Sequence, residues 1–438
     1  MVKTCNSRLK LIRFFALVAA VVFAAIALVS GCTYYKDSKS WLLGTIEKNY
    51  YFYDDFDTSG VEDLSLKEIG ARLDKYSEYY TAEEFEAEMS DNEGHKSGIG
   101  LYTNFIDGKG IYVVQVVGNS PADMAGITAG DLLISGKRGE QVTKFETANN
   151  FSDFVLSNAT GEKFVLSTAE KDFTVSREEY TSSYTYMATN KTAWEFTSTA
   201  DGGLAPKENP SKARSYLPDD AAYINLSQFF GTAGGEMGAL FEKFNAANKK
   251  SLILDLRNNG GGYVSVMQDI AGYFTSSLSS KSSVAMTCEY RNGRKQLWHA
   301  IKHTGNSLIP TDTKVYVLAN SGTASASEAL IGVLVSYDFL KYENIFISDY
   351  SDEYLEWAGG EEKTAQTYGK GIMQSTFRYY STGEAVKLTT AKIKWPNDKC
   401  IHDVALSKAD GCTIVPAAWT ATKNDEELQT VIDIINAR

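Results

Sequence analysis

Residues 251–262, SLILDLRNNGGG, run from an apolar segment into a polar, glycine-rich loop, and residues 263–277, YVSVMQDIAGYFTSS, follow with a helical pattern. A short continuous apolar run predicts a buried strand, so the two stretches predict one strand–loop–helix unit. Similar stretches lie on both sides of it from residue 216 onward: AAYINLSQF, GEMGALFEKFNAAN, KVYVLAN, ASEALIGVLVSY and NIFISD. Strands that alternate with helices form parallel sheets, and the sequence therefore predicts an α/β core over residues 216–438.

Polar loops follow two of these strands, at the sheet edge where α/β proteins bind their ligands. In the NNGGG loop, successive glycines let backbone N–H groups converge on an oxygen atom with no side chain in the way. A phosphate cradle is the competing interpretation, but no GxxxxGK[ST] lysine follows and the glycines lack dinucleotide-binding spacing. Taken alone, the loop is better interpreted as a plain strand-to-helix turn.

The second loop, NSGTASASEAL at 320–330, carries four hydroxyl side chains: Ser321, Thr323, Ser325 and Ser327. Ser325 and Glu328 have the S-x-x-E spacing of a capping box, so one interpretation makes Ser325 a helix cap and nothing more. A nucleophile would suit the same place, because free N–H groups at a helix start favour developing negative charge. The N–H of Ala326 would then bind the oxyanion formed by attack from Ser325.

A serine nucleophile needs a base. None of the four histidines has a telling motif, although His402-Asp403 could supply a pair by tertiary contact; the four are His95, His299, His303 and His402. The alternative is Lys370 in TYGKGIMQ, residues 367–374, with Gln374 four positions on and on the same side of a helix or strand. Burial must lower the pKa of such a lysine from about 10.4 toward about 7 to 8 before it can act as a base. Considered alone, Lys370 is better interpreted as a surface lysine.

The segments before the core differ from it in composition. Residues 41–93 read as helical, with capping-box spacing between Thr81 and Glu84, and predict a packing domain without chemistry. Residues 94–178 contain short β-rich runs punctuated by glycine, in an order that resembles a PDZ domain of the permuted bacterial protease type. A small β-domain that uses its glycines only for tight turns is the alternative. Residues 179–215 predict a linker or irregular strands.

The PDZ resemblance implies a peptide-binding turn. In such domains the backbone amides of the turn capture a C-terminal carboxylate, and the adjacent strand adds the peptide to the sheet edge. The corresponding residues here are Gly98, Ile99, Gly100 and Leu101.

The N-terminus has the pattern of an export signal. Four basic residues precede an uncharged run that ends in Val29-Ser30-Gly31-Cys32 and is shorter than the roughly 20 residues of a bilayer span. That tetrapeptide resembles a bacterial lipobox, so residues 1–31 are predicted to be removed, Cys32 to carry lipid, and residues 32–40 to form a tether. An uncleaved membrane anchor is the alternative.

Charge and cysteine content exclude several function classes. The net charge is −12, and removal of residues 1–31, with four basic and no acidic residues, makes it −16, which argues against nucleic acid as a partner. No CxxC or His/Cys cluster with metal spacing exists. Cys400 and Cys412 are the closest pair for a disulfide in an exported chain, but the sequence leaves the pairing open.

The ordered motifs YINLSQF, LDLRNNGGG, ANSGTASASEAL and TYGKGIMQ stand behind the PDZ-like segment and a leader containing LDKYSEYYTAEEF. From about Trp41 to Pro416 this order resembles the C-terminal processing peptidases, the tail-specific Ser/Lys proteases. The resemblance implies a crotonase/ClpP-like core, with Ser325 as nucleophile, Lys370 as general base and Gln374 as its orienting partner. It also implies an oxyanion hole from the N–H of Ala326 and of Gly261, with Gly262 as the alternative to Gly261.

The chain departs from the family in the separation of Ser325 and Lys370, which lie 45 positions apart, farther than usual, with the acidic, aromatic stretch 348–366 between them. The implied function is an exported, lipid-anchored serine endopeptidase of the bacterial cell envelope that recognises the C-terminal tail of a protein or peptide and needs no cofactor or metal. One alternative is a non-catalytic PDZ-type peptide-binding lipoprotein. The other is a Ser-His, tricorn-like hydrolase with His402 or His299 as base.

Overall fold

The computed structural model describes residues 35–278, 283–351, 364–417 and 425–437. The predicted signal sequence, Cys32 and most of the acidic, aromatic stretch 348–366 lie outside these ranges. Among the helices of the described ranges, none combines the length and the apolar character that a membrane span requires.

An eight-stranded sheet forms the core, with the strand order β13-β12-β11-β14-β15-β18-β19-β22. Its parallel part, which the alternating pattern predicts, consists of β14 (Ala221–Leu226), β15 (Ser251–Asp255), β18 (Lys314–Ala319), β19 (Ile345–Tyr350) and β22 (Thr413–Ala417). The helices packed on it are α7 (Ala233–Ala246), α8 (Val264–Thr275), α9 (Ala326–Ser336) and α11 (Glu426–Asn436).

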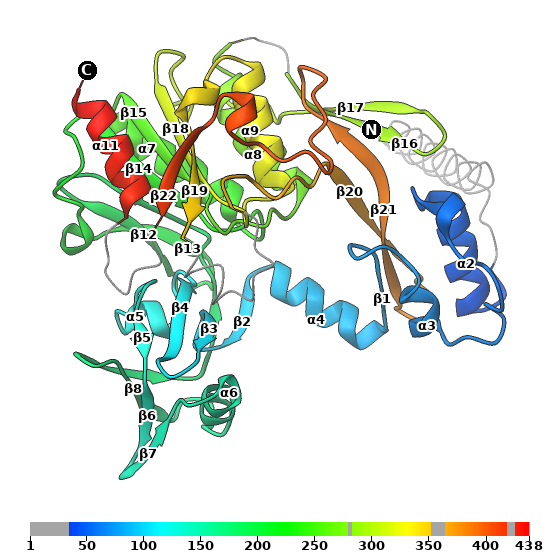
Figure 1. Cartoon of the computed structure of the whole chain (residues 1–438), viewed down its shortest axis with the longest axis horizontal. Helices are drawn as coiled ribbons and strands as arrows, with labels where there is room; N and C mark the ends of the chain where they lie inside the picture. The colour runs from blue at the N-terminus through cyan, green and yellow to red at the C-terminus, as the bar shows by residue number, and fades with distance from the viewer. Residues whose placement is uncertain (1–34, 279–282, 352–363, 418–424, 438) are drawn as a thin grey trace, which may run out of the picture.

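Helices cover both faces of this sheet, which explains why its strands are apolar on both sides. Leu252 and Leu254 of β15 pack in the cluster that includes α7, α8 and α9. The intervening Ile253 packs on the other face with α11, the C-terminal helix (Figure 1). The carboxyl ends of β15 and β18 consequently stand side by side at one edge of a fixed scaffold.

About half of residues 179–215, predicted to be a linker or irregular strands, lies in regular strands. It contains β10 (Glu178–Thr181), β11 (Thr185–Ala188), β12 (Ala193–Ser198) and β13 (Leu204–Glu208). Strand β11 pairs antiparallel with β14 and extends the core sheet through β12 to β13. The Thr/Ser-rich composition fits strands once a sheet edge is available, which only the tertiary structure provides.

A second, antiparallel sheet was not predicted from the sequence. It joins β1 (Glu78–Tyr80), β16 (Val284–Tyr290), β17 (Lys295–His299), β20 (Ile372–Arg378) and β21 (Ala385–Lys394). Strand β20 starts just after Lys370, and β1, from the N-terminal segment, pairs with β21. Two segments that are far apart in sequence are thereby brought to one place.

The N-terminal segment packs on that sheet (Figure 1). Its helices are α2 (Ser38–Asn49), η1 (Tyr53–Asp55), α3 (Leu66–Gly70) and α4 (Ala82–Asn92). Trp41 and Leu42 of α2 share one apolar cluster with Val386 and Leu388 of β21. Helix α2 begins at Ser38, so a tether that reaches residue 40, as predicted, is too long by the first residues of this helix.

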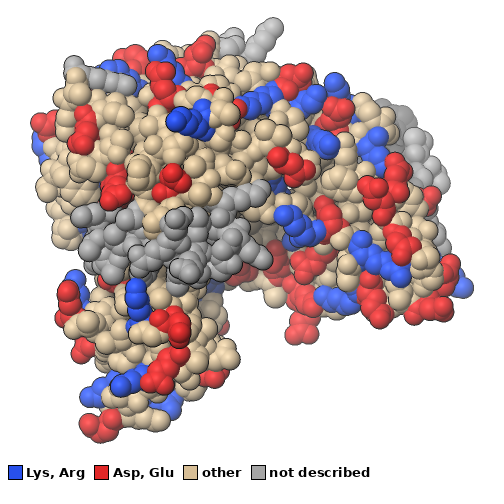
Figure 2. Space-filling model, viewed as in Figure 1, with Lys and Arg blue, Asp and Glu red and all other residues tan. Residues whose placement is uncertain are grey.

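The glycine-punctuated segment forms a β-rich lobe that projects below the core in Figures 1 and 2. It contains β2 (His95–Gly98), β3 (Leu101–Ile106), β4 (Gly110–Val116), β5 (Leu132–Leu133), β6 (Ser135–Arg138), β7 (Gln141–Lys144), β8 (Lys163–Ser167), β9 (Asp172–Ser176), α5 (Pro121–Met124) and α6 (Ala148–Leu156). One apolar cluster from Ile99 to Val175 fills it. Basic and acidic side chains are interspersed over the face shown in Figure 2.

Candidate active site

Ser325 stands at the turn between β18 and α9, as the N-cap residue of that helix. Its backbone has φ 58° and ψ −114°, a region that a residue with a side chain rarely adopts. Such strain costs about 1 to 3 kcal/mol and persists only where the surroundings enforce it, as at a nucleophile held on a sharp strand-to-helix turn.

The structure separates the four hydroxyl groups of this loop. Thr323 and Ser327 are fully buried, and their hydroxyls donate to the carbonyls of Leu256 (2.8 Å) and Asn259 (2.9 Å). Both therefore fix the loop against the end of β15. Ser325 instead lines a cavity of about 710 Å³.

This cavity brings the predicted catalytic residues together. Ser325, Ala326, Gly262, Lys370 and Gln374 all line it. No histidine of the described chain lies among its lining residues. His402 contacts the neighbouring Asp403 carboxylate at 3.3 Å, and His299 pairs with Val284 at the end of β17.

The environment of Lys370 favours its neutral form. The side chain is partly buried, and desolvation, followed by the positive charge of Lys387, holds its pKa below the ordinary 10.5. Its Nζ lies 4.5 Å from the ring centroid of Tyr76, which comes from the N-terminal segment. A lysine with a lowered pKa in a cavity beside a serine has the property that a general base requires.

Glu328 links the two loops that carry Ser325 and Lys370. Its fully buried carboxylate accepts hydrogen bonds from the N–H of Ser325 (3.0 Å) and of Lys370 (2.9 Å) through Oε2. Its Oε1 accepts from the Thr367 hydroxyl (2.7 Å) and the Gly369 N–H (2.8 Å). The capping-box spacing identified Glu328 as a helix-start residue, whereas its wider role as a tie between two loops depends on tertiary contact.

Gln374 is oriented by Thr389 on the neighbouring strand β21. Its Nε2 donates to the Thr389 hydroxyl at 3.1 Å. A β-bulge between Met373 and Gln374 shifts the register of β20 against β21 at this point of the cavity wall.

The NNGGG loop lies against the start of α9, and its geometry corrects one predicted role. A Cβ atom at Gly261 (φ +101°) would lie 2.9 Å from the Ala326 nitrogen and from the Ser325 Cβ, so only glycine fits. However, the Gly261 N–H already donates to Asn259 Oδ1 at 2.9 Å, which opposes its assignment as an oxyanion donor. Within the described residues, the N–H groups of Ala326 and Gly262 have no acceptor.

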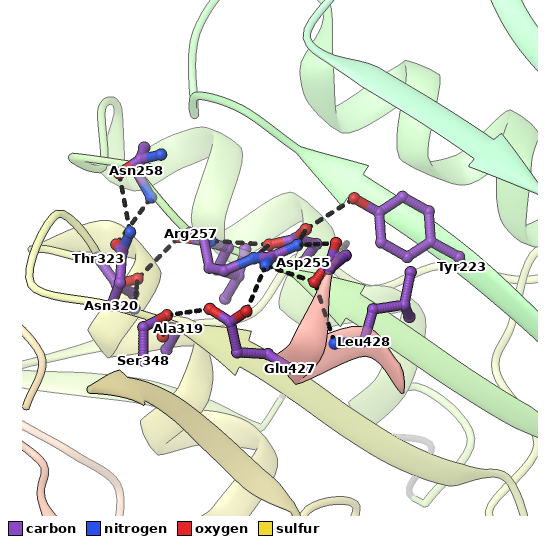
Figure 3. Close-up of polar contacts among 12 residues, drawn as sticks. Tyr223, Asp255, Arg257, Asn258, Ala319, Asn320, Thr323, Ser348, Glu427 and Leu428 are labelled. Atoms are coloured by element: carbon purple, nitrogen blue, oxygen red, sulfur yellow. Dashed lines mark hydrogen bonds and ion pairs between the residues drawn. The ribbon is translucent and has the colours of Figure 1, made fainter. Parts of the chain in front are cut away.

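A polar network under this loop fixes its position (Figure 3). Arg257, the last residue before NNGGG, donates to both Asp255 and Asp425, the latter by two bonds of 2.8 Å. Asp425 is the N-cap residue of α11, so the C-terminal helix is tied to the loop. The side chains of Asn258 and Asn320 complete the link between the two strand ends, at 2.8 Å.

Comparisons with known proteins agree with this geometry. The sequence model of peptidase family S41 matches residues 220–341, the segment that holds Ser325 and the NNGGG loop. A CtpA-like serine protease of Staphylococcus epidermidis is 25% identical over 402 residues, which cover 87% of this chain and 68% of that protein. A carboxyl-terminal-processing protease of Synechocystis is 29% identical over 215 residues, 49% of this chain and 43% of that one.

Residues 220–341 thus match peptidase family S41, and the chain is similar to C-terminal processing peptidases. A solved structure assigned to the S41 proteases, from Bacteroides fragilis, has the same overall fold, with a TM-score of 0.57 at 14% identity and coverage of 92% of this chain and 98% of that one. These similarities support a serine peptidase with a protein or peptide substrate.

Other predicted sites are not among the residues that line the cavity. In the β-rich lobe, Gly98 ends β2, Ile99 and Gly100 form the turn, and Leu101 begins β3. Cys288, Cys400 and Cys412 are free thiols, so the described chain contains no Cys400–Cys412 disulfide. No cluster of His, Cys, Asp and Glu in the described ranges could hold a metal ion.

The contribution of the N-terminal segment to the cavity was not predicted from the sequence. Lys75, Tyr76 and Ser77 line the cavity, although residues 41–93 were predicted to be packing without chemistry. The only signal for these residues was their position in LDKYSEYYTAEEF, one of the motifs that carried the family resemblance.

Proposed function

We propose that this protein is an S41 peptidase that hydrolyses its substrate with a Ser325–Lys370 dyad. The observation that carries the proposal is the shared cavity, which is lined both by Ser325 at a strained helix start and by a partly buried lysine whose pKa is lowered. The absence of a histidine among the described lining residues favours lysine over His402 or His299 as the base.

The reaction follows from these positions. Neutral Lys370 takes the proton of the Ser325 hydroxyl as Oγ attacks the scissile carbonyl. The N–H groups of Ala326 and Gly262 hold the oxyanion, and Lys370 returns the proton to the leaving amine. Water, with Lys370 again as base, then hydrolyses the acyl-enzyme. Every group required belongs to the protein.

We further propose that the β-rich lobe is a PDZ domain that captures the substrate's C-terminus. Among the described residues, strand β3, which begins at Leu101, is an edge strand of its three-stranded sheet and pairs with β4, so its outer edge is suited to strand addition. Gly98 (φ +141°) and Gly100 (φ +80°) give the preceding turn the backbone conformation that an amide cradle requires. The same proposal includes a crotonase/ClpP-like core, lipid attachment at Cys32 and a place in the bacterial cell envelope.

Labelling with a fluorophosphonate, which reacts with activated serines, tests the dyad. We expect Ser325 to be the labelled residue in the parent protein, and both Ser325→Ala and Lys370→Ala to abolish labelling and cleavage of unfolded casein. Cleavage that is equal in Ser325→Ala and the parent would remove the proposed nucleophile. Folded protein that is neither labelled nor active would instead favour the non-catalytic peptide binder.

A further inference from the structure

The loop between α3 and β1 carries an aspartate that is connected to the proposed active site. The Thr389 hydroxyl donates to Asp74 Oδ2 at 2.7 Å and accepts from Gln374 Nε2 at 3.1 Å. Asp74 is thus the end of a hydrogen-bond chain that reaches Gln374 through a fully buried threonine. The Asp74 N–H in turn donates to the Tyr50 hydroxyl at 2.8 Å, which fixes this loop to the end of α2.

We propose that Asp74 is a positioning residue, which acts through Thr389 to hold the Gln374 carboxamide with its oxygen toward Lys370. This inference rests on the proposed Ser325–Lys370 dyad, and it extends the active site to a segment outside the matched family region of residues 220–341.

The direction of each hydrogen bond in the Gln374–Thr389–Asp74 chain follows from which groups can donate and which can only accept. An ionised carboxylate only accepts, so the single Thr389 proton must point to Asp74. The Thr389 oxygen then accepts, and the side of Gln374 that faces it must be the NH₂ group. The carboxamide oxygen is left for the cavity that Gln374 shares with Lys370, where it can accept an N–H of the lysine and orient the amine toward Ser325.

A second observation indicates that Asp74 is present for its charge. Within the described residues, Asp74 Oδ1 is buried and accepts no hydrogen bond. An unsatisfied buried acceptor costs stability, and a neutral asparagine could satisfy the same contacts at lower cost. An asparagine at this position could also donate to Thr389, and the threonine could then donate to a flipped Gln374. A carboxylate is therefore required only if the donor-to-acceptor direction of the hydrogen-bond chain matters.

Asp74 also contributes to the field at Lys370. Its negative charge raises the pKa of the lysine, against the stronger effects of desolvation and of Lys387. The other groups that face Lys370 come from the loop before it, from α9 and from the loop before β1: Tyr368, Glu328 and Tyr76. Removal of the Asp74 charge should therefore lower the pKa of Lys370 while it disorders the carboxamide.

The test is the rate at which the fluorophosphonate labels Ser325, measured from pH 6 to 10 together with kcat and KM on fluorescein-labelled casein. For Asp74→Asn we expect the labelling rate and kcat to be at least about tenfold lower than in the parent, with little change in KM, because a positioned general base contributes about 10²- to 10⁴-fold. The acid limb of the pH–rate profile should also move to lower pH. Thr389→Val should lose rate with its acid limb unmoved, and Thr389→Ser should restore the rate of the parent.

Controls separate this inference from a simple loss of folding. Asp54→Asn, an exposed carboxylate of the same N-terminal segment, should match the parent. If thermal unfolding shows that the Asp74→Asn protein is not folded, the rates of Thr389→Val and Thr389→Ser are compared instead to test the hydrogen-bond chain. Parent-like rates and acid limb in folded Asp74→Asn, or equal rates in the two Thr389 variants, would overturn the role of Asp74 and leave the dyad intact. A parent protein without Ser325-dependent labelling would refute the dyad and this inference together.

Discussion

Glu328→Gln should reduce both stability and activity, because one carboxylate holds the Ser325 and Lys370 loops together. The glutamate accepts four hydrogen bonds, two on each oxygen. Glutamine keeps one oxygen but replaces the other with an NH₂ group that faces two donors. Two bonds to a charged acceptor are lost, each worth about 1.5 to 3 kcal/mol, which gives about 3 to 6 kcal/mol.

Burial reduces that figure. Desolvation raises the pKa of Glu328 above its ordinary value, in opposition to the four hydrogen bonds, so the charged form is costly to keep. Glutamine avoids this cost, and we expect the net loss to lie near the lower bound, about 3 kcal/mol. In thermal unfolding the midpoint should fall by about 5 °C or more.

Activity should fall further than stability alone explains, since the released backbones carry the nucleophile and the base. Fluorophosphonate labelling of Ser325 at a temperature where both proteins are folded should be at least about tenfold slower. The exposed Glu343→Gln, on η3 (Tyr342–Asn344), is the matched control and should leave both readouts unchanged. A Glu328→Gln protein with the midpoint and labelling rate of the parent would refute the argument.

Three further predictions concern the loops around the cavity. Gly261→Ala should destabilise the protein by at least about 1 to 3 kcal/mol, because the φ of Gly261 is +101° and an added Cβ would contact the start of α9. An added Cβ at Gly260 has no atom within 4 Å, so Gly260→Ala should unfold at the same temperature as the parent. Equal unfolding midpoints for the two variants would contradict this prediction. Because burial lowers the pKa of Lys370 from 10.5, labelling of Ser325 should rise with pH as the amine loses its proton, with a midpoint below 10.5. A limb near 6.5 would point to histidine instead. Asp425→Asn should weaken the two hydrogen bonds from Arg257, lower the free energy of unfolding in urea by about 2 kcal/mol or more, and slow the labelling of Ser325. Unchanged values would show that the contact with α11 does not stabilise the NNGGG loop.

The similarity to family S41 and the candidate residues could be predicted from the sequence. Residues 251–255 are predicted to form a buried strand because the first four are apolar or small enough to pack on both faces of a sheet. The fifth, Asp255, is paired with Arg257 two positions on. The glycines of NNGGG and the small residues around Ser325 also carry local information, because the φ values and close approaches that they permit are properties of the residues themselves.

The arrangement of the proposed active site was decided by tertiary contacts. Gly261 and Gly262 are equivalent as donors in sequence, and only the bond from the Gly261 N–H to Asn259 distinguishes them. Likewise, Glu328 looks like a helix cap until the Lys370 loop folds onto it.

The N-terminal segment gives the clearest separation of the two kinds of information. Its helices were predictable from local periodicity and capping, which depend on residues three or four positions apart. The pairing of β1 with β21, and with it the contact of Asp74 with Thr389, joins residues 315 positions apart in the chain. Such contacts leave no periodic pattern in a single sequence, because they depend on which sheet edge is free once the core has packed.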